Sequence, residues 1–203
     1  MIFENITGII LCGGKSTRMK TNKALLRLGQ KPIIEIMLEK MKRNFGEIIL
    51  SANDPDLFNY LNFPVVQDIY PNRGPLAGIH SSLSSSSTEK NFIISCDTPL
   101  ITDDIIKYLS DYPTNKKIIL PLHNGRVQQL CGIYSKGIVK IVEEILCEAE
   151  NKGNVKGSIF DLLERVESEI VDVSSFSPPG ADVFLNMNTP EDYELIKKNY
   201  SPN

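Results

Sequence analysis

Glycines and cations directly follow the first apolar run of the chain. Gly13 and Gly14 end the run at residues 6–12, and no acidic residue occurs from position 15 to position 34. Glycine lets backbone N–H groups approach an anion closely, and a local excess of positive charge attracts polyphosphate. The whole chain carries a net charge of −3, so this positive segment is a local feature. We therefore predict a phosphate-binding loop, whose cations are Lys15, Arg18, Lys20, Lys23, Arg27 and Lys31.

Two common phosphate motifs do not fit this loop. A Walker A motif that ends at Gly14-Lys15-Ser16 needs a glycine at position 9, which is Ile9. A count from Gly8 reaches Gly13, after which the motif needs a lysine but Gly14 follows. The dinucleotide fingerprint fails because no third glycine is in register. The segment is therefore a different kind of phosphate loop, or a surface turn with solvated lysines.

Two aspartates each follow another apolar run. Asp97 comes after residues 92–95, and Asp68 comes after residues 65–67 and before a loop rich in proline and glycine at 71–78. Magnesium takes one or two carboxylates together with phosphate oxygens and water. With a phosphate loop at the same sheet edge, Asp97 is predicted to bind Mg²⁺, although an acidic residue in a turn before proline is the plain alternative. The loop at 71–78 offers backbone donors near a base or ribose.

Strand-like runs alternate with helical patterns along the chain, and this order positions the loop and the aspartates. It predicts an α/β fold with a mostly parallel sheet, helices on both faces and right-handed connections. In such sheets ligands bind at the carboxyl ends of the strands. Asn124-Gly125 predicts a hairpin turn, Gly29 a tight turn, and the serines at 81–87 a helix end with a surface loop. The expected strands are 6–12, 48–50, 65–66, 92–95 and 118–120, and the expected helices are 32–45, 76–83, 102–109, 138–149 and 190–199.

Composition narrows the class of protein. The 203 residues are 41% hydrophobic and 23% charged, which is typical of a globular protein. The slight excess of acidic residues argues against a dedicated nucleic-acid binder, and no apolar run approaches the roughly 20 residues that span a membrane. Four cysteines without a CxxC pair, and no visible secretory signal, predict a reduced, cytoplasmic setting. His80 and His123 are too far apart in sequence to suggest a zinc motif.

Five segments, in order, resemble the molybdenum cofactor guanylyltransferases, and the resemblance covers nearly the whole chain. It implies a Rossmann-like three-layer αβα nucleotidyltransferase fold in one domain, 1–203, with a nucleotide-binding half at about 1–110 and an acceptor-binding half at about 111–203. It also implies Mg²⁺-dependent transfer of GMP from GTP to the molybdopterin cofactor, which gives the guanine dinucleotide form and pyrophosphate. The segments are Leu11 to Met19, Lys23, Gly74-Pro75-Leu76-Ala77-Gly78, Cys96-Asp97-Thr98-Pro99 and Asn186 to Asp192.

The resemblance also implies roles for individual residues. Lys23 would bind the phosphates, Asp97 both nucleotide and Mg²⁺, and Asp68 the nucleotide. The expected catalytic residues are Lys23, Asp97 and Arg18. A nucleotide-contacting asparagine of some relatives falls at Ser51, with Asn53 two residues on. Backbone contacts to the nucleotide are expected at Leu11, Cys12, Gly13 and Gly14, and contacts to the acceptor at Asn186 and Asn188.

Three positions depart from the family pattern. Cys12 replaces a usual alanine, Lys20 replaces a usual glycine, and Gln128-Gln129-Leu130 lacks the proline that often follows the first glutamine. We interpret these as divergence rather than loss of activity.

The implied reaction needs little covalent help from the protein. The terminal phosphate of the acceptor is the nucleophile, and its second pKa of about 6 leaves it mostly dianionic at neutral pH. Cations must therefore bring the anions together, with Lys15 and Arg18 holding the leaving phosphates.

Several alternatives remain open from the sequence. One is a related cytidylyltransferase or another nucleotidyltransferase of the same fold, and another is a non-catalytic protein that binds the nucleotide or carries the cofactor. A dinucleotide-dependent dehydrogenase is disfavoured because its glycine fingerprint is missing. The expected partners are GTP, the molybdopterin cofactor, and proteins of cofactor delivery or molybdoenzyme maturation.

Overall fold

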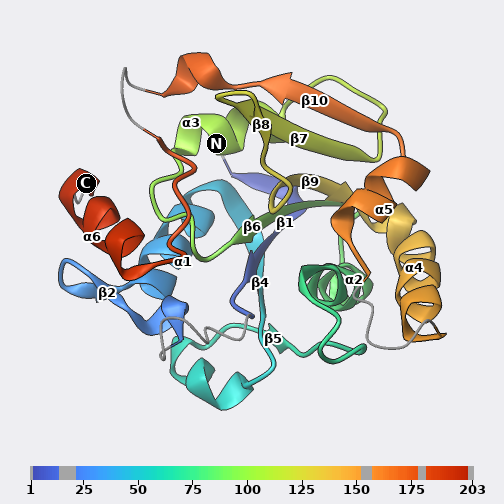
Figure 1. The fold of residues 1–203 in the computed structure, drawn as a ribbon, viewed down its shortest axis with the longest axis horizontal. Coiled ribbons are helices and arrows are strands. Elements are labelled where there is room, and N and C mark those ends of the chain that lie inside the picture. The colour runs from blue at the N-terminus through green and yellow to red at the C-terminus, as the bar shows by residue number, and fades with distance from the viewer. Residues whose placement is uncertain (1, 14–21, 152–156, 178–181, 201–203) are drawn as a thin grey trace.

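The chain forms one large sheet with helices on both faces (Figure 1). The structure is a computed structural model, and it describes residues 2–13, 22–151, 157–177 and 182–200. The sheet runs in the order β10-β7-β9-β6-β1-β4-β5, with β8 paired to β7. The bounds of its strands are β1 Phe3–Leu11, β4 Phe45–Ser51, β5 Val65–Val66, β6 Lys90–Ser95, β7 Ile118–His123, β8 Arg126–Val127, β9 Cys131–Ser135 and β10 Ser168–Asp172.

Most neighbouring strands are parallel, as the alternating pattern predicts. The pairs β1–β4, β1–β6, β4–β5 and β10–β7 are parallel, whereas β9 is antiparallel to both β6 and β7. Leu11 at the end of β1 is in register with Ser51 at the end of β4 and with Ser95 at the end of β6. Three strands therefore end level, so the loops that follow them meet at one edge.

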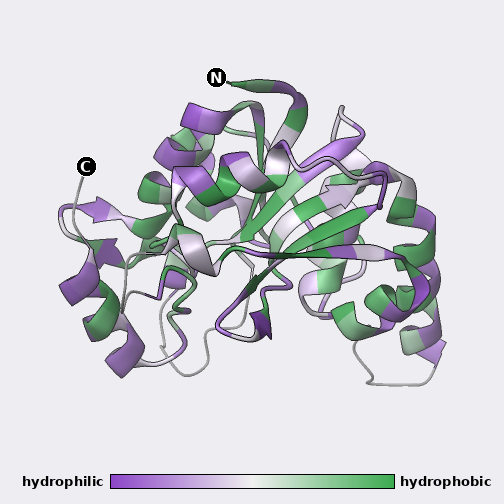
Figure 2. Cartoon of the chain, turned by 90° about the horizontal axis from the view of Figure 1, so that it is seen from above, coloured by the Kyte–Doolittle hydropathy of each residue, from purple (hydrophilic) through white to green (hydrophobic). Residues whose placement is uncertain are grey.

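Helices form a layer on each side of this sheet. On one face, α1 (Ile33–Asn44) packs beside α3 (Asp103–Ser110), and on the other α2 (Pro75–Ser85) packs beside α4 (Val139–Asn151), followed by α5 (Ile159–Arg165). Two apolar cores, one for each face, fill the space between the helices and the sheet. Figure 2 shows the hydrophobic strands between the two helical layers. The predicted three-layer αβα arrangement is confirmed.

Three helix boundaries test the capping predictions. Thr102 caps α3 by accepting a hydrogen bond from the backbone N–H of Ile105, as its position before two acidic residues predicts. Pro32, expected inside the first helix, instead lies just before it and pairs with Arg27 in the short hairpin of β2 (Arg27–Leu28) and β3 (Lys31–Pro32). Phe45, expected in that helix, begins β4, where its ring packs between the sheet residues Phe3 and Phe92.

The predicted hairpin after β7 is present but interrupted. Asn124 and Gly125 have φ angles of +49° and +72°, the left-handed pair that a primed turn requires. His123 pairs with Arg126 across this turn, but β8 ends at Val127, and the return strand β9 begins only at Cys131.

Other parts of the fold were unexpected or differ from expectation. The sequence pattern did not indicate α5 or the edge strand β10. The serine-rich segment does end a helix, but Ser86 is buried and contacts Thr7 and Thr88 instead of forming a surface loop.

All four cysteines are free, and three are buried. Within the described ranges, no helix has the length and apolar character needed to cross a bilayer. The last helix, α6 (Pro190–Asn199), lies beside the β2–β3 hairpin, where the hydroxyl of Tyr193 donates to the carbonyl of Arg27 (Figure 1).

Candidate active site

Backbone hydrogen bonds hold the ends of β1, β4 and β6 together at the predicted site. The N–H of Cys12 donates to the carbonyl of Ser51 at 2.8 Å, and the N–H of Cys96 donates to the carbonyl of Leu11 at 3.1 Å. Both cysteine side chains are buried, and a side-chain hydrogen bond with Cys96 together with burial raises the pKa of the Cys12 thiol. Cys12 is therefore a neutral packing residue, and the chain emerges into open space at Gly13.

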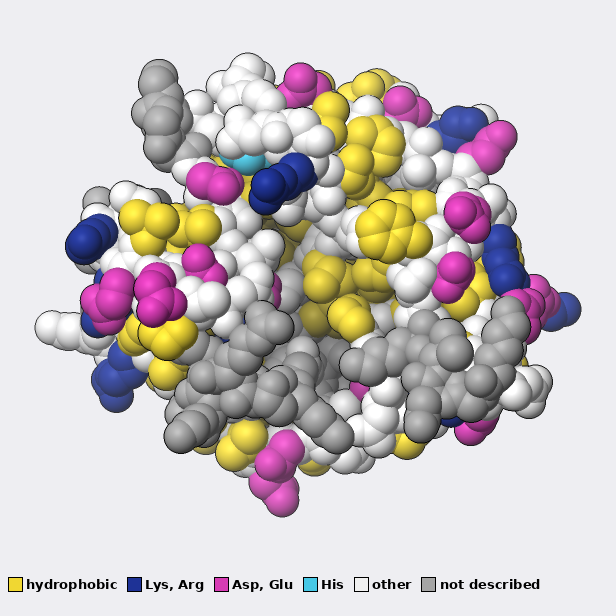
Figure 3. Space-filling model, in the orientation of Figure 1, with side chains coloured by type: hydrophobic (Ala, Val, Ile, Leu, Met, Phe, Trp, Pro, Cys, Tyr) yellow, Lys and Arg dark blue, Asp and Glu magenta, His cyan; other side chains and the backbone are white. Residues whose placement is uncertain are grey.

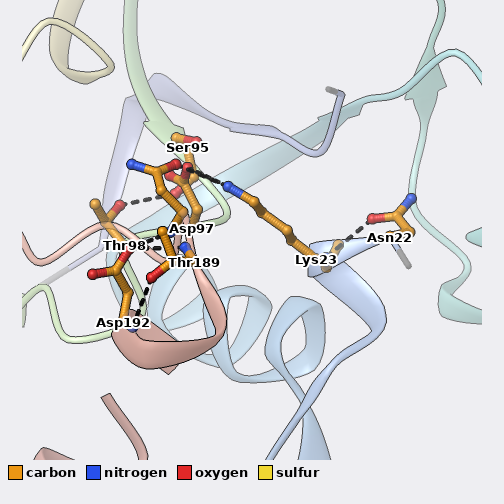
Figure 4. Close-up of polar contacts among 9 residues, drawn as sticks. Asn22, Lys23, Ser95, Asp97, Thr98, Thr189 and Asp192 are labelled. Carbon is orange, nitrogen blue, oxygen red and sulfur yellow. Dashed lines mark hydrogen bonds and ion pairs between the residues drawn. The ribbon is translucent and has the colours of Figure 1, made fainter. Parts of the chain in front are cut away.

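Lys23 reaches this edge and contacts two other predicted site residues. Its ammonium donates to the side-chain oxygen of Asn188 at 2.9 Å and lies 3.7 Å from Asp97 Oδ2. The Lys23 and Asp97 side chains are each 19% exposed. Lys23 begins a 3₁₀ turn, Lys23–Leu25, which Asn22 caps by accepting from the N–H of Ala24. Figure 4 shows the lysine side chain reaching from this turn to Asp97.

A second set of contacts fixes the segment that carries Asn188. The N–H of Met187 donates to the carbonyl of Asp97 at 3.0 Å, which ties this segment to the turn after β6. Thr189 caps α6, and Asp192 Oδ2 accepts from the N–H groups of both Asn188 and Thr189 at 3.0 and 2.8 Å. Asp192 was not among the predicted site residues, although its spacing from Thr189 is that of a capping box.

The Asp97 carboxylate has one oxygen without a protein partner. Its Oδ1 atom is buried and accepts no hydrogen bond from the described residues. An unpaired carboxylate oxygen in a buried position is costly, which indicates a missing ligand. No group of three histidine, cysteine or acidic side chains gathers around a potential metal site in the described part of the chain. One carboxylate suits Mg²⁺, which takes its other ligands from phosphate and water, rather than a metal that needs a protein cage.

Asp68 and Ser51 meet on the other side of β1, beside α2. Asn53 Nδ2 donates to Asp68 Oδ2 at 2.7 Å, and Asn53 Oδ1 accepts from the N–H of Asp68 at 2.9 Å. Burial raises the pKa of the Asp68 carboxyl, and the hydrogen bond from Asn53 partly opposes this rise. A Cβ atom placed on Gly78 would lie 2.8 Å from Ser51 Oγ and 3.5 Å from Asp68 Oδ1. A side chain at position 78 would therefore force the serine or the helix to move.

The structure thus brings most of the predicted residues to one sheet edge in two groups. Leu11, Cys12 and Gly13 lie between the Lys23–Asp97–Asn188 group and the Ser51–Asn53–Asp68 group. Asn53, two residues after the predicted Ser51, is the amide that holds Asp68. The expected phosphate-loop residues Gly14, Lys15, Arg18 and Lys20 lie outside the described residues.

A pocket of about 510 Å³ adjoins the first of these groups. Asn186 and Asn188, the predicted acceptor contacts, both line it, as do His123 and Arg126 of the β7–β8 hairpin. Asn188 therefore faces both the pocket and Lys23. The site can hold an anion at Lys23 while a second molecule occupies the pocket beside it.

Comparisons with known proteins show the family to which the chain belongs. The model of the MobA-like NTP transferase domain matches residues 8–166. The probable molybdenum cofactor guanylyltransferase of Carboxydothermus hydrogenoformans is 36% identical over 98% of both chains. Its counterpart in Clostridium perfringens strain 13 is 35% identical over 93% of this chain and 95% of the relative.

A solved structure shares the fold. The molybdopterin-guanine dinucleotide biosynthesis protein A of Archaeoglobus fulgidus superimposes with a TM-score of 0.79 at 20% identity, over 95% of this chain and 97% of that one. The chain belongs to the family of MobA-like NTP transferases and is, like the relatives that carry the name molybdenum cofactor guanylyltransferase, a nucleotidyltransferase.

Proposed function

We propose that this enzyme transfers GMP from GTP to the terminal phosphate of the molybdopterin cofactor in a Mg²⁺-dependent reaction. The observation that carries the proposal is the placement of the Lys23 ammonium between Asp97 and Asn188 at the carboxyl edge of the sheet. The names of the full-length relatives support this choice of donor and acceptor. An oxygen of the acceptor phosphate attacks the α-phosphorus of GTP, the bond to the bridging oxygen of the β-phosphate breaks, and pyrophosphate leaves with that electron pair.

The chain's own residues hold the reactants and neutralise charge. No general base is required, because the attacking phosphate is already ionised at neutral pH. Lys23 contacts the phosphates and offsets the negative charge that develops as pyrophosphate leaves, while Asn188 fixes the direction of its ammonium. Mg²⁺ held at Asp97 Oδ1 would add positive charge next to the same phosphates.

The second group of residues suits the nucleoside. The Asp68 carboxylate, held by Asn53, presents an acceptor for ribose or base donors beside Ser51. The backbone of Leu11, Cys12 and Gly13 runs between this group and Lys23, where the phosphates would bridge the two. Gly14, Lys15 and Arg18 complete the phosphate site in this proposal.

Pyrophosphate release tests the reaction and the base preference together. The purified enzyme is mixed with molybdopterin, Mg²⁺ and GTP, CTP or ATP in turn, and pyrophosphate is measured with and without EDTA. We expect release with GTP that EDTA abolishes. Release with CTP alone would assign the enzyme as a cytidylyltransferase. Nucleotide binding without any release would favour a non-catalytic carrier.

The proposal also concerns the setting of the reaction. Four free cysteines suit a reducing compartment, so we place the reaction in the cytoplasm. There the product would pass to the proteins that deliver it to molybdoenzymes.

A further inference from the structure

The pocket beside Lys23 has a defined polar wall. It lies between the β7–β8 hairpin and the segment that leads into α6, and its walls include His123, Arg126, Asp182, Phe184, Asn186 and Asn188. Figure 3 looks onto this face, which is hollowed in the middle, with histidine, basic and acidic side chains along one rim. Because Asn188 also accepts the hydrogen bond from Lys23, a ligand in the pocket can extend to the Lys23 ammonium, where the proposed function places the phosphates.

Asp182 holds a fixed carboxylate at this pocket. Its Oδ1 atom accepts from the N–H of Phe184 at 3.0 Å and lies 3.6 Å from His123 Nε2. The side chain is 51% exposed, so it remains open to a ligand. His123 is only 3% exposed, and its ring packs on Phe184 with 5.2 Å between the ring centres. The carboxylate is therefore oriented before a ligand arrives.

Part of the wall has unused hydrogen-bonding capacity. His123 Nδ1 is buried without a hydrogen-bond partner among the described residues. No hydrogen bond from the described residues is found at Asp182 Oδ2, in contrast to Oδ1. A wall that combines a rigid acceptor pair, a neighbouring imidazole and a guanidinium is suited to a flat, polar heterocycle rather than to an aliphatic chain.

We propose that this pocket binds the pterin end of the acceptor and that Asp182 recognises its 2-amino-4-oxo edge, an inference that rests on the proposed transfer to a molybdopterin acceptor. The 2-amino group and the ring N–H next to it are two parallel donors. A carboxylate accepts such a pair through both oxygens, in the same bidentate geometry as it accepts a guanidinium. The acceptor phosphate would then lie at Lys23, with Asn188 between the two ends.

Guanine presents the same donor pair, so the donor nucleotide is a second source of this chemistry. The structure favours the acceptor because the residues suited to the nucleoside, Ser51 and Asp68, lie on β4 and after β5, whereas the pocket lies at β7, two strands beyond β6 in the sheet. The two sources predict different effects of one substitution.

The test is Asp182→Asn, which keeps an oxygen to accept from the N–H of Phe184 but removes the charge and one acceptor. The probe is 6-hydroxymethylpterin monophosphate, titrated by quenching of pterin fluorescence, and GTP is titrated separately in the presence of Mg²⁺. We expect the variant to bind the pterin phosphate roughly 10- to 100-fold more weakly, as for loss of charge-assisted hydrogen bonds. Its affinity for GTP should remain within twofold of the wild-type value.

Asp172→Asn is the matched control. Asp172 also accepts from a backbone N–H two residues ahead, that of Ser174 at 2.8 Å, and its charge also interacts with His123, but it does not line the pocket. This variant should bind the pterin phosphate as the wild type does.

Three results would overturn the assignment: no binding of the pterin phosphate by the wild-type protein, equal binding by Asp182→Asn, or a loss confined to GTP. Failure of the wild type to release pyrophosphate from GTP contradicts the proposed function instead, because that assay does not depend on which residue contacts the pterin.

Discussion

The side-chain oxygen of Asn188 accepts a hydrogen bond from the ammonium of Lys23 at 2.9 Å, although the two residues are 165 positions apart in the sequence. Lys23 follows the first strand, whereas Asn188 precedes the last helix. The contact joins the two ends of the chain across the candidate active site, so the direction of the Lys23 ammonium depends on how α6 begins.

Replacement of Lys23 by alanine should reduce turnover far more than it reduces GTP affinity. A cation that contacts charge developing in the transition state contributes more there than in the bound substrate, and loss of such a contact costs about 100- to 1000-fold in kcat. The measurement is steady-state pyrophosphate release, with GTP binding followed by calorimetry. Lys197→Ala is the control, because Lys197 pairs with Glu194 on the exposed surface of α6. Unchanged turnover in Lys23→Ala would remove the assigned role.

The second prediction concerns Asp192, which holds the backbone of Asn188 and caps α6. Asp192→Ala should lower the free energy of unfolding by about 1 kcal/mol, the usual cost of a lost cap. It should also reduce turnover roughly 10- to 100-fold, because a small displacement of Asn188 misdirects Lys23. Urea unfolding and pyrophosphate release measure the two effects.

Glu191→Ala provides the matched comparison for Asp192. Glu191 lies in the same first turn but takes no part in the capping box. Glu191→Ala should change neither the free energy of unfolding nor the turnover by much. A variant of Asp192 that is destabilised but fully active would show that Asn188 does not direct the lysine.

The positions of the strand ends could be predicted from the sequence, but the contacts between distant segments could not. Apolar runs of β-branched residues identified β1 and β6, and the residues after them, Gly13 and Asp97, follow directly. The strand β10 was not predicted: its apolar pair Ile170-Val171 stands among acidic residues, and Val171 is the one buried residue of the strand.

No local sequence pattern predicts that Lys23 contacts Asn188 or that Asp182 contacts His123. Neither pair has a fixed sequence spacing, and each depends on how the segment before α6 packs on the sheet. The role of Lys23 itself was predicted from resemblance to a family rather than from the pattern of charges, which contained six candidate cations.

Gly78 leads to a third prediction, on packing. An alanine there would place its Cβ atom 2.8 Å from Ser51 Oγ, which forces the helix or the serine to move. Overpacking of this kind lowers the free energy of unfolding by about 1 to 3 kcal/mol. The better helix propensity of alanine offsets up to about 1 kcal/mol of this loss. We expect Gly78→Ala to be less stable and to bind GTP more weakly.

The double variant Gly78→Ala with Ser51→Ala separates packing from other causes. Removal of Ser51 Oγ leaves the next atoms at 3.5 Å, which is ordinary contact distance. Stability should therefore return towards that of Ser51→Ala alone. If the double variant is as unstable as the sum of the two single variants, the serine is not the obstacle.

The last prediction follows from the environment of Asp68. Burial raises the pKa of this carboxyl above that of the unfolded chain, so the folded protein binds this proton more tightly. Its contribution to stability is therefore fully present below the pKa of the unfolded chain and is lost as the pH rises through the folded pKa. Asp68→Asn removes this dependence. The variant should be more stable than the wild type at neutral pH, and the difference should shrink as the pH falls towards the pKa of the free side chain. Urea unfolding at pH 4 and pH 7 measures this difference in stability. The comparison is Asp56→Asn, at an exposed carboxylate that accepts from Asn59.

The same Asp68 variant should bind GTP more weakly, because a charged acceptor makes stronger hydrogen bonds to ribose or base donors than a neutral one. A gain in stability with unchanged GTP affinity would place Asp68 outside the nucleotide site, whereas a loss of both would show that the carboxylate supports the fold through Asn53.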